Sequence, residues 1–153
     1  MYNRRDALKH SAAVAGLLVG AGVFSSDAFA AFNQAAFKAK NLNEALQALG
    51  AAGAPSESPD VILSAPNPAE NGAVVPISVS TTLVGIKQFV ILVEKNPVPL
   101  AARFNLTDSL TATIATRIKM AESSVVYAVA VMHDGRALFA KKAIDVIQGG
   151  CAA

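Results

Sequence analysis

The chain has 153 residues, which is enough for one domain with a hydrophobic core, and 53% of them are hydrophobic. Its formal net charge is only +2, and the basic residues are scattered along the chain, which argues against a nucleic-acid-binding surface. One cysteine and two histidines are too few for a four-ligand zinc site. No cofactor motif is present either, so we expect neither a metal nor a cofactor.

The first 30 residues have the pattern of a twin-arginine signal peptide. Arg4 and Arg5 precede an apolar run over residues 12–24, and a small-x-small cleavage site follows at residues 28–30. The apolar run is too short to cross a bilayer, so we expect a cleaved signal and no stable membrane anchor. The mature chain would begin near Ala31 and reach the oxidising periplasm.

The segment after the signal predicts a short helix and then a loop. Asn41 followed by Glu44 is typical of a helix N-terminal cap, and apolar residues recur at helical spacing over residues 42–49. Gly50 can end the helix. The small, polar and proline-containing residues 51–59 predict a connecting loop.

From residue 60 the apolar pattern has a period of two, which is typical of strands. Pro76 suggests an edge position or a bulge, because proline cannot donate to a ladder. Two runs, 89–93 and 125–132, are apolar on both faces, which indicates strands between layers or against a partner. The predicted strands lie at 61–63, 75–79, 86–94, 103–106, 110–118, 125–132 and 138–147, with turns at 71–72, 96–99 and 133–135.

About seven short strands without an intervening helix favour an all-β, antiparallel β-sandwich with a short N-terminal helix. We therefore divide the chain into a signal peptide (1–30), a helix and linker (31–59), a β-sandwich domain (60–147) and a C-terminal arm (148–153).

The ionisable residues are single groups at turns or strand ends. His133 lies beside Asp134 in a predicted turn, where a histidine is usually a solvated surface group. Solvated side chains are likewise expected for Asp60, Glu70, Glu94, Asp108 and Glu122. Nothing in the sequence holds a base beside the cysteine, so we do not expect the chain to be an enzyme by itself.

The C-terminal tail is the most informative stretch, because it carries the only cysteine, Cys151. Undocked chain ends are usually poorly ordered, and glycine samples backbone angles closed to other residues, so we expect a flexible arm with an exposed thiol. Its small side chains would let it enter a narrow channel. The thiol has no activating neighbour, so its reactivity must come from the site it enters. The predicted arm consists of Gln148, Gly149, Gly150, Cys151, Ala152 and Ala153.

Three functional interpretations of Cys151 stand beside that of a frayed tail with an incidental cysteine. The first is a covalent carrier that presents the thiol to several enzymes. The second is an exported binding or structural sandwich that uses the thiol for an intermolecular disulfide. The third, a thiol oxidoreductase, is disfavoured because no second cysteine is available to resolve a mixed disulfide.

The sequence resembles the SoxY family of the Sox thiosulfate-oxidising system over nearly its whole length. The matching parts are residues 70–77, residues 116–124, the hairpin at Asp134 and Gly135, and the C-terminal Gly-Gly-Cys. The resemblance implies an immunoglobulin-like sandwich and a swinging arm on which Cys151 carries thiosulfate as a cysteine S-thiosulfonate. The arm here ends in Cys-Ala-Ala, where the family pattern is Cys-Gly-Gly.

The resemblance also implies partners. The carrier would form a heterodimer with a SoxZ-like protein. The strands at 89–93 and 125–132, which are apolar on both faces, would suit that interface. The haem enzyme SoxXA would load the cysteine, SoxB would release sulfate by hydrolysis, and a sulfane dehydrogenase, where present, would oxidise the remaining sulfur. The protein would act in the periplasm, exported by the twin-arginine route.

Overall fold

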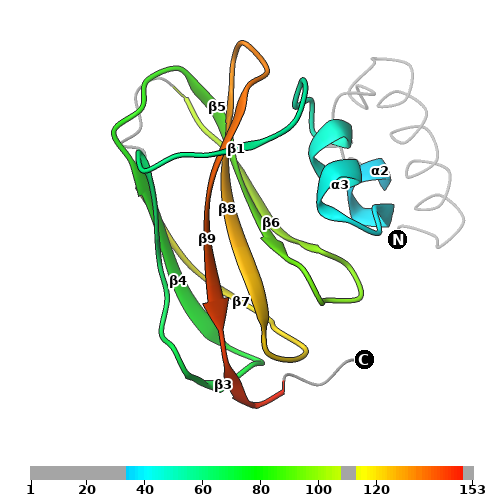
Figure 1. Ribbon diagram of the computed structural model, residues 1–153, viewed down its shortest axis with the longest axis vertical. Coiled ribbons are helices and arrows are strands. Elements are labelled where there is room, and N and C mark those ends of the chain that lie inside the picture. The colour runs from blue at the N-terminus through cyan, green and yellow to red at the C-terminus, as the bar shows by residue number, and fades with distance from the viewer. Residues whose placement is uncertain (1–33, 108–112, 150–153) are drawn as a thin grey trace, which may run out of the picture. The chain divides into compact units, whose positions relative to one another are not determined.

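The computed structural model describes residues 34–107 and 113–149, which lie in the second of two compact units, Asn33–Ala153. The predicted signal peptide lies outside the described residues. The described part is a β-sandwich preceded by two short helices (Figure 1), which confirms the predicted all-β, immunoglobulin-like class. The elements are α2 (Gln34–Lys38), α3 (Leu42–Ala48), β1 (Ser56–Glu57), β2 (Val61–Ser64), β3 (Ala69–Asn71), β4 (Val75–Thr81), β5 (Ile86–Val93), β6 (Leu100–Asn105), β7 (Thr113–Ile118), β8 (Ser124–Met132), β9 (Ala137–Ile144) and β10 (Val146–Gln148).

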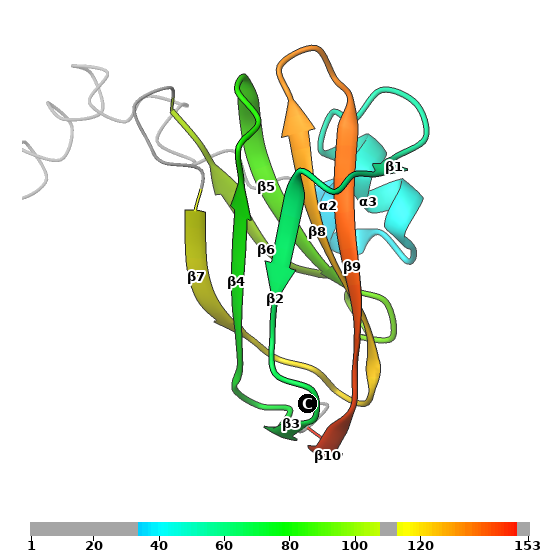
Figure 2. The same ribbon diagram turned by 60° about the vertical axis from the view of Figure 1, so that its left-hand side comes forward.

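Two sheets face each other across the core. The larger has five strands in the order β1-β9-β8-β5-β6, and the smaller has three in the order β2-β4-β7. All pairs in these two sheets are antiparallel except β1 with β9. A third, parallel pair of β10 and β3 lies at one end of the sandwich (Figure 2).

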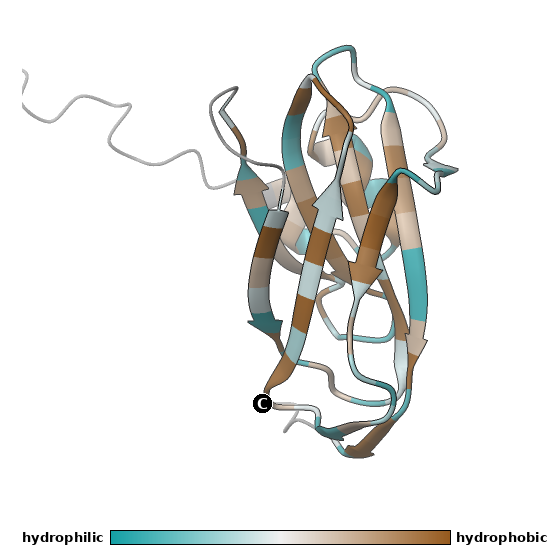
Figure 3. Cartoon of the chain, turned by 90° about the vertical axis from the view of Figure 1, so that its left-hand side faces the viewer, coloured by the Kyte–Doolittle hydropathy of each residue, from teal (hydrophilic) through white to brown (hydrophobic). Residues whose placement is uncertain are grey.

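The main core lies between the two sheets. Phe89, Ile91 and Val93 of β5 belong to it and are fully buried. They pack in one cluster with alternate residues of β4, along which hydrophobic and polar residues alternate (Figure 3). Burying each large apolar side chain contributes about 1.5–3 kcal/mol, so this alternation fixes which face of each strand points inward.

A second core lies on the other face of the large sheet. Val90 and Leu92 of β5 and Val129 of β8 are buried there with Leu46 and Leu49 of the α3 region. The prediction that β5 and β8 lie between layers is confirmed. The interpretation of the same strands as a partner interface is wrong, because the chain's own helices cover their second face.

The cap of α3 follows the predicted pattern. The Asn41 Oδ1 accepts the Glu44 N–H at 2.9 Å, and the Asn41 Nδ2 donates to the Glu44 Oε1 at 2.7 Å. The Lys40 N–H donates to the Glu44 Oε2 at 3.0 Å. These bonds, the one from Lys40 first, lower the pKa of Glu44. Gly50 has a φ of 88°, a left-handed angle that ends the helix region as predicted.

Several predicted boundaries differ from the structure. Strand β6 begins at Leu100, three residues before the predicted start at 103, and Asn71 of the predicted turn belongs to β3. The expected loop over residues 51–59 contains β1, whose Ser56 lies opposite Leu138 and covers the outer edge of β9. The expected single last strand is divided at Asp145. The strand divides there because β8 ends at Ser124, opposite Ile144, so the chain beyond that pair takes its partner from β3 instead.

Pro76 does not mark an edge strand. Strand β4 is the middle strand of its sheet, and Pro76 lies opposite Arg117 of β7. On the other side, β2 pairs with β4 only as far as Ser64 opposite Ser78. Pro76 is therefore tolerated because one flank of β4 is unpaired at that position.

Candidate functional site: the root of the C-terminal tail

Cys151 lies outside the described residues, together with Gly150, Ala152 and Ala153. The structure describes the chain that leads to them. We call residues 146–149 the tail root, because they connect the sandwich to the cysteine.

The tail root is part of a small parallel sheet. Gln148 of β10 lies opposite Asn71 of β3. The Ala69 N–H donates to the Asp145 carbonyl, and the Gly72 N–H donates to the Gln148 carbonyl, both at 2.7 Å. The predicted start of the arm at Gln148 is therefore corrected: Gln148 is a strand residue, because β3 satisfies its backbone.

Gly149 is in close contact with the sandwich. A Cβ built on Gly149 would lie 2.6 Å from the carbonyl oxygen of Ala121, closer than real Cβ atoms approach other atoms. The obstructing atom belongs to the backbone, so it cannot rotate away as a side chain would. Gly149 itself is exposed and lies just past the end of β10, and the Ala121 carbonyl leaves no room for a side chain there.

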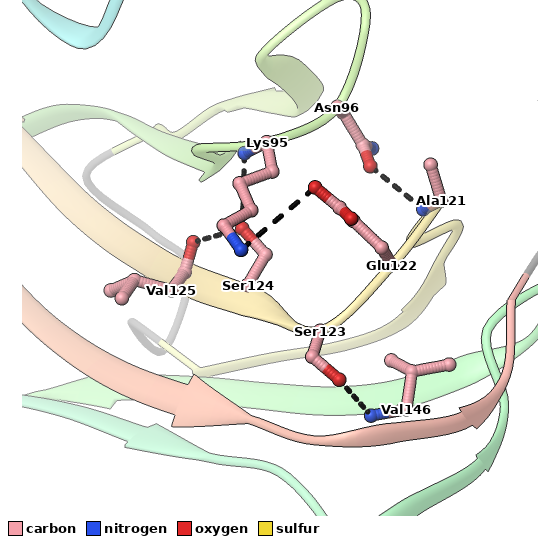
Figure 4. Close-up of polar contacts among 8 residues, drawn as sticks. All are labelled: Lys95, Asn96, Ala121, Glu122, Ser123, Ser124, Val125 and Val146. Atoms are coloured by element: carbon pink, nitrogen blue, oxygen red, sulfur yellow. Dashed lines mark hydrogen bonds and ion pairs between the residues drawn. The ribbon is translucent and has the colours of Figure 1, made fainter.

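The Ala121 carbonyl lies in residues 119–123, a segment that we call the clamp segment. Asn96, from the turn after β5, holds this segment through both ends of its amide, and Figure 4 shows the bond to Ala121. Its Nδ2 donates to the Lys119 carbonyl at 2.8 Å, and its Oδ1 accepts the Ala121 N–H at 2.9 Å. One side chain thus fixes the segment that contacts Gly149.

The clamp segment is also bonded to both sides of the small sheet. The Met120 N–H donates to the Gly72 carbonyl at 2.7 Å. The Val146 N–H donates to the Ser123 Oγ at 2.9 Å (Figure 4). Hydrogen bonds therefore connect the clamp segment to the turn after β3 and to the first residue of the tail root.

Charge contributes little to this arrangement. Lys95 and Glu122 form an ion pair at 3.9 Å, but their side chains are 57% and 62% exposed. Such pairs are worth at most about 1 kcal/mol, because water screens them and the long side chains lose conformational freedom. The Lys95 backbone N–H makes a further bond, at 3.0 Å, to the Ser124 Oγ. The site is therefore held mainly by hydrogen bonds and close packing.

The other ionisable candidates face solvent, as predicted for those that the structure describes. His133 is exposed, and the neighbouring Asp134 accepts bonds from the Arg136 backbone N–H and Nε at 3.0 and 2.8 Å, which lower the pKa of Asp134. Asp108 lies outside the described residues. Exposed carboxylates are found at Asp60, Glu70, Glu94 and Glu122. Within residues 34–107 and 113–149, no three His, Cys, Asp or Glu side chains are grouped to hold a metal.

A groove of about 440 Å³ is lined by residues of β4, of β7 and of the end of β2 with the chain after it. Its lining includes Pro66, Pro76 and Arg117, and Arg117 is the one ionisable residue among its lining residues. The lining contains no histidine, cysteine or carboxylate, so the groove holds no pair of groups for acid–base or nucleophilic chemistry.

The fold and the tail root define a class: a β-sandwich that binds its own C-terminal segment at one end of the domain. The chain belongs to the SoxY family, whose model, described as "Sulfur oxidation protein SoxY", matches residues 46–151, more than half of the chain. The match extends from α3 to Cys151. The resemblance drawn from the sequence is confirmed.

Solved structures show the same fold. The structure of the sulfur carrier protein SoxY from Chlorobium limicola f thiosulfatophilum matches with a TM-score of 0.62 and 27% sequence identity, covering 69% of this chain and 96% of that chain. A superoxide reductase (neelaredoxin) from Ignicoccus hospitalis matches with a TM-score of 0.50 and 18% identity, covering 56% of this chain and 79% of that chain, and shows the fold alone. No curated protein matches the chain.

Sequence reasoning missed the residues that hold the tail root. Residues 70–77 and 116–124 resemble the family, but no local pattern shows that Asn96 bonds across more than 20 positions to Ala121. No helix within the described ranges is long and apolar enough to span a bilayer.

Proposed function

We propose that the protein is a covalent carrier of sulfur intermediates, with Cys151 as the attachment point and thiosulfate-derived sulfur as the cargo. The observation that carries the proposal is the tail root: hydrogen bonds hold the chain to the sandwich as far as the Gln148 carbonyl, three residues before the only cysteine, and Gly149 lies close to the Ala121 carbonyl. Membership of the SoxY family and the similarity to a sulfur carrier protein support the same role.

The length of the tail suits presentation of a thiol. Two peptide units separate Gly149 from Cys151, so their Cα atoms are at most about 7 Å apart. The side chains around the cysteine, at Gly150, Ala152 and Ala153, are a hydrogen or a methyl group. A segment this narrow enters a channel that would exclude a larger side chain, and enzymes with such channels are the partners that we propose.

The chemistry follows from the thiol. In loading, the Cys151 sulfur bonds to the sulfane sulfur of thiosulfate, the thiol proton leaves, and two electrons pass to a haem enzyme resembling SoxXA. The product is cysteine S-thiosulfonate. Water then attacks the sulfonate sulfur in an enzyme resembling SoxB, the bond to the sulfane sulfur breaks, and sulfate leaves a persulfide on Cys151. In a sulfane dehydrogenase-like enzyme the outer sulfur takes up three oxygen atoms from water, and six electrons pass to the enzyme as six protons leave. A second hydrolysis in the SoxB-like enzyme then releases sulfate and restores the Cys151 thiol.

The protein itself catalyses none of these steps in this proposal. It contributes an attachment point, and the partner enzymes contribute activation. We also propose that it works as a heterodimer with a SoxZ-like partner in the periplasm, exported by the twin-arginine route that its first 30 residues predict.

The test is the intact mass of the full chain isolated from thiosulfate-oxidising cells. We expect mass increases that correspond to thiosulfate-derived groups, lost on reduction and absent from Cys151→Ser. The serine variant is a matched control, because it changes one atom of the side chain. A protein that shows only a reducible, disulfide-linked dimer and no such mass contradicts the carrier function and supports the disulfide interpretation.

A further inference from the structure

We propose that Gly149 is a positioning residue, which fixes the point from which Cys151 reaches its partners. In this proposal the two glycines before the cysteine have different roles. Gly149 is seated against the clamp segment, and only the link beyond it sets the reach of the thiol. The part that concerns sulfur loading rests on the proposed function.

The first argument is the contact itself. Gly149 has no left-handed φ that would require glycine, whereas Gly50 and Gly135 do. What requires glycine is the Ala121 carbonyl oxygen, 2.6 Å from the position of a Cβ. Conformational freedom is therefore not the reason for glycine at position 149.

The second argument is that the contacting carbonyl is itself held in place. Asn96 bonds to the Lys119 carbonyl and to the N–H of Ala121 itself, and these two bonds hold the chain that leads into this carbonyl. The Met120 N–H bonds to the Gly72 carbonyl, and Gly72 in turn donates to Gln148. A shift of the whole clamp segment away from a methyl group would therefore break bonds to Asn96 and Gly72.

The consequence is geometric. With Gly149 fixed, the Cα of Cys151 stays within about 7 Å of the Gly149 Cα. If the chain were instead free from Asp145 onward, six peptide units would separate the last fixed residue from Cys151. The largest possible distance between their Cα atoms would then be about three times as long. A fixed root confines the thiol to one end of the sandwich, so a partner that takes up the tail must approach Asn96 and Glu122, both near the tail root.

Amide hydrogen exchange in the full chain tests the seating, with Gly149→Ala as the variant and Gly150→Ala as the matched control. In Gly149→Ala, exchange should accelerate at least tenfold at Gly72, whose N–H bonds to Gln148, and at Val146, whose N–H bonds to Ser123. Exchange at the core residue Val129 should stay unchanged. Gly150→Ala should leave all three rates as in the wild type.

Equal effects of the two variants, or an unchanged Gly72 rate in Gly149→Ala, would overturn the proposal. Acceleration at Val129 as well would show a general loss of stability, and would also overturn a positioning role. A second variant guards against that outcome. Asn96→Ala removes the bonds to the Lys119 carbonyl and the Ala121 N–H, which leaves the clamp segment freer to shift. Adding Gly149→Ala to it should therefore accelerate Gly72 exchange less than Gly149→Ala does alone. Additive effects contradict the role given to Asn96.

Two reactions of Cys151 distinguish a positioning role of Gly149 from a general effect on the fold. Alkylation by iodoacetamide needs no docking, so its rate should stay within about twofold of wild type in Gly149→Ala, while partner-dependent loading with thiosulfate falls at least tenfold. If wild-type protein fails to load, the proposed function fails, and the exchange result still decides the role of Gly149. If wild type and Gly149→Ala load equally, the positioning role fails alone.

Discussion

Replacing Asn96 by alanine should weaken the end of the sandwich from which the tail departs. The change removes two hydrogen bonds, at 2.8 Å to Lys119 and 2.9 Å to Ala121. Each bond has a net value of about 0.5–1.5 kcal/mol, and Asn96 is only half-buried, so we expect the free energy of unfolding to fall by about 1–2 kcal/mol. Equilibrium unfolding in urea measures this as a lower midpoint at an unchanged slope.

The matched control is Asn43→Ala, on the exposed side of α3. Asn43 is exposed, and its replacement should change the free energy of unfolding by less than about 0.5 kcal/mol. An Asn96→Ala midpoint that coincides with that of Asn43→Ala would refute the reasoning, since the clamp segment would then hold its position without the Asn96 amide.

Three further outcomes follow from the described contacts. Phe89→Ala should lower the free energy of unfolding by about 3–5 kcal/mol, because it empties a fully buried position between the sheets; a loss below 1 kcal/mol in urea unfolding would contradict the packing. Gly135→Ala should cost at least about 1 kcal/mol in the same assay, because φ is 87° and the new Cβ would lie 3.0 Å from the Cβ of Ala52. Glu44 has a lowered pKa, so the stability of wild type relative to Glu44→Gln should be full above the ordinary carboxyl pKa and disappear as the pH falls through the lowered value; a difference that does not change with pH would contradict the cap.

The sequence predicts most of the sandwich because its signals are local. Hydrophobic and polar residues alternate along β4, as expected for a strand with one buried face. Strand β5 is apolar on both faces, which predicts an inner strand, and the turn at Gly135 separates β8 from β9. Side-chain burial and turn geometry depend on residues within a few positions of one another, so they leave a readable pattern.

The same reasoning fails where the structure depends on distant partners. Alternation continues past Ile144, so nothing local shows that the chain leaves the large sheet at Asp145 and joins the three-residue strand β3. The role of Gly149 depends on a carbonyl 28 positions earlier in the chain, at Ala121. Two adjacent glycines, read without the fold, predict a backbone with high conformational freedom. The close contact between Gly149 and the Ala121 carbonyl instead restricts the chain at that position.

The central claim is that Cys151 carries sulfur, and fragmentation of one peptide tests it most directly. Trypsin cleavage after Lys142 releases residues 143–153, which contain the only cysteine. In protein taken from cells supplied with thiosulfate, we expect fragment masses that place a thiosulfate-derived group on Cys151 and on no other residue. An unmodified peptide from cells that are actively oxidising thiosulfate would contradict the claim.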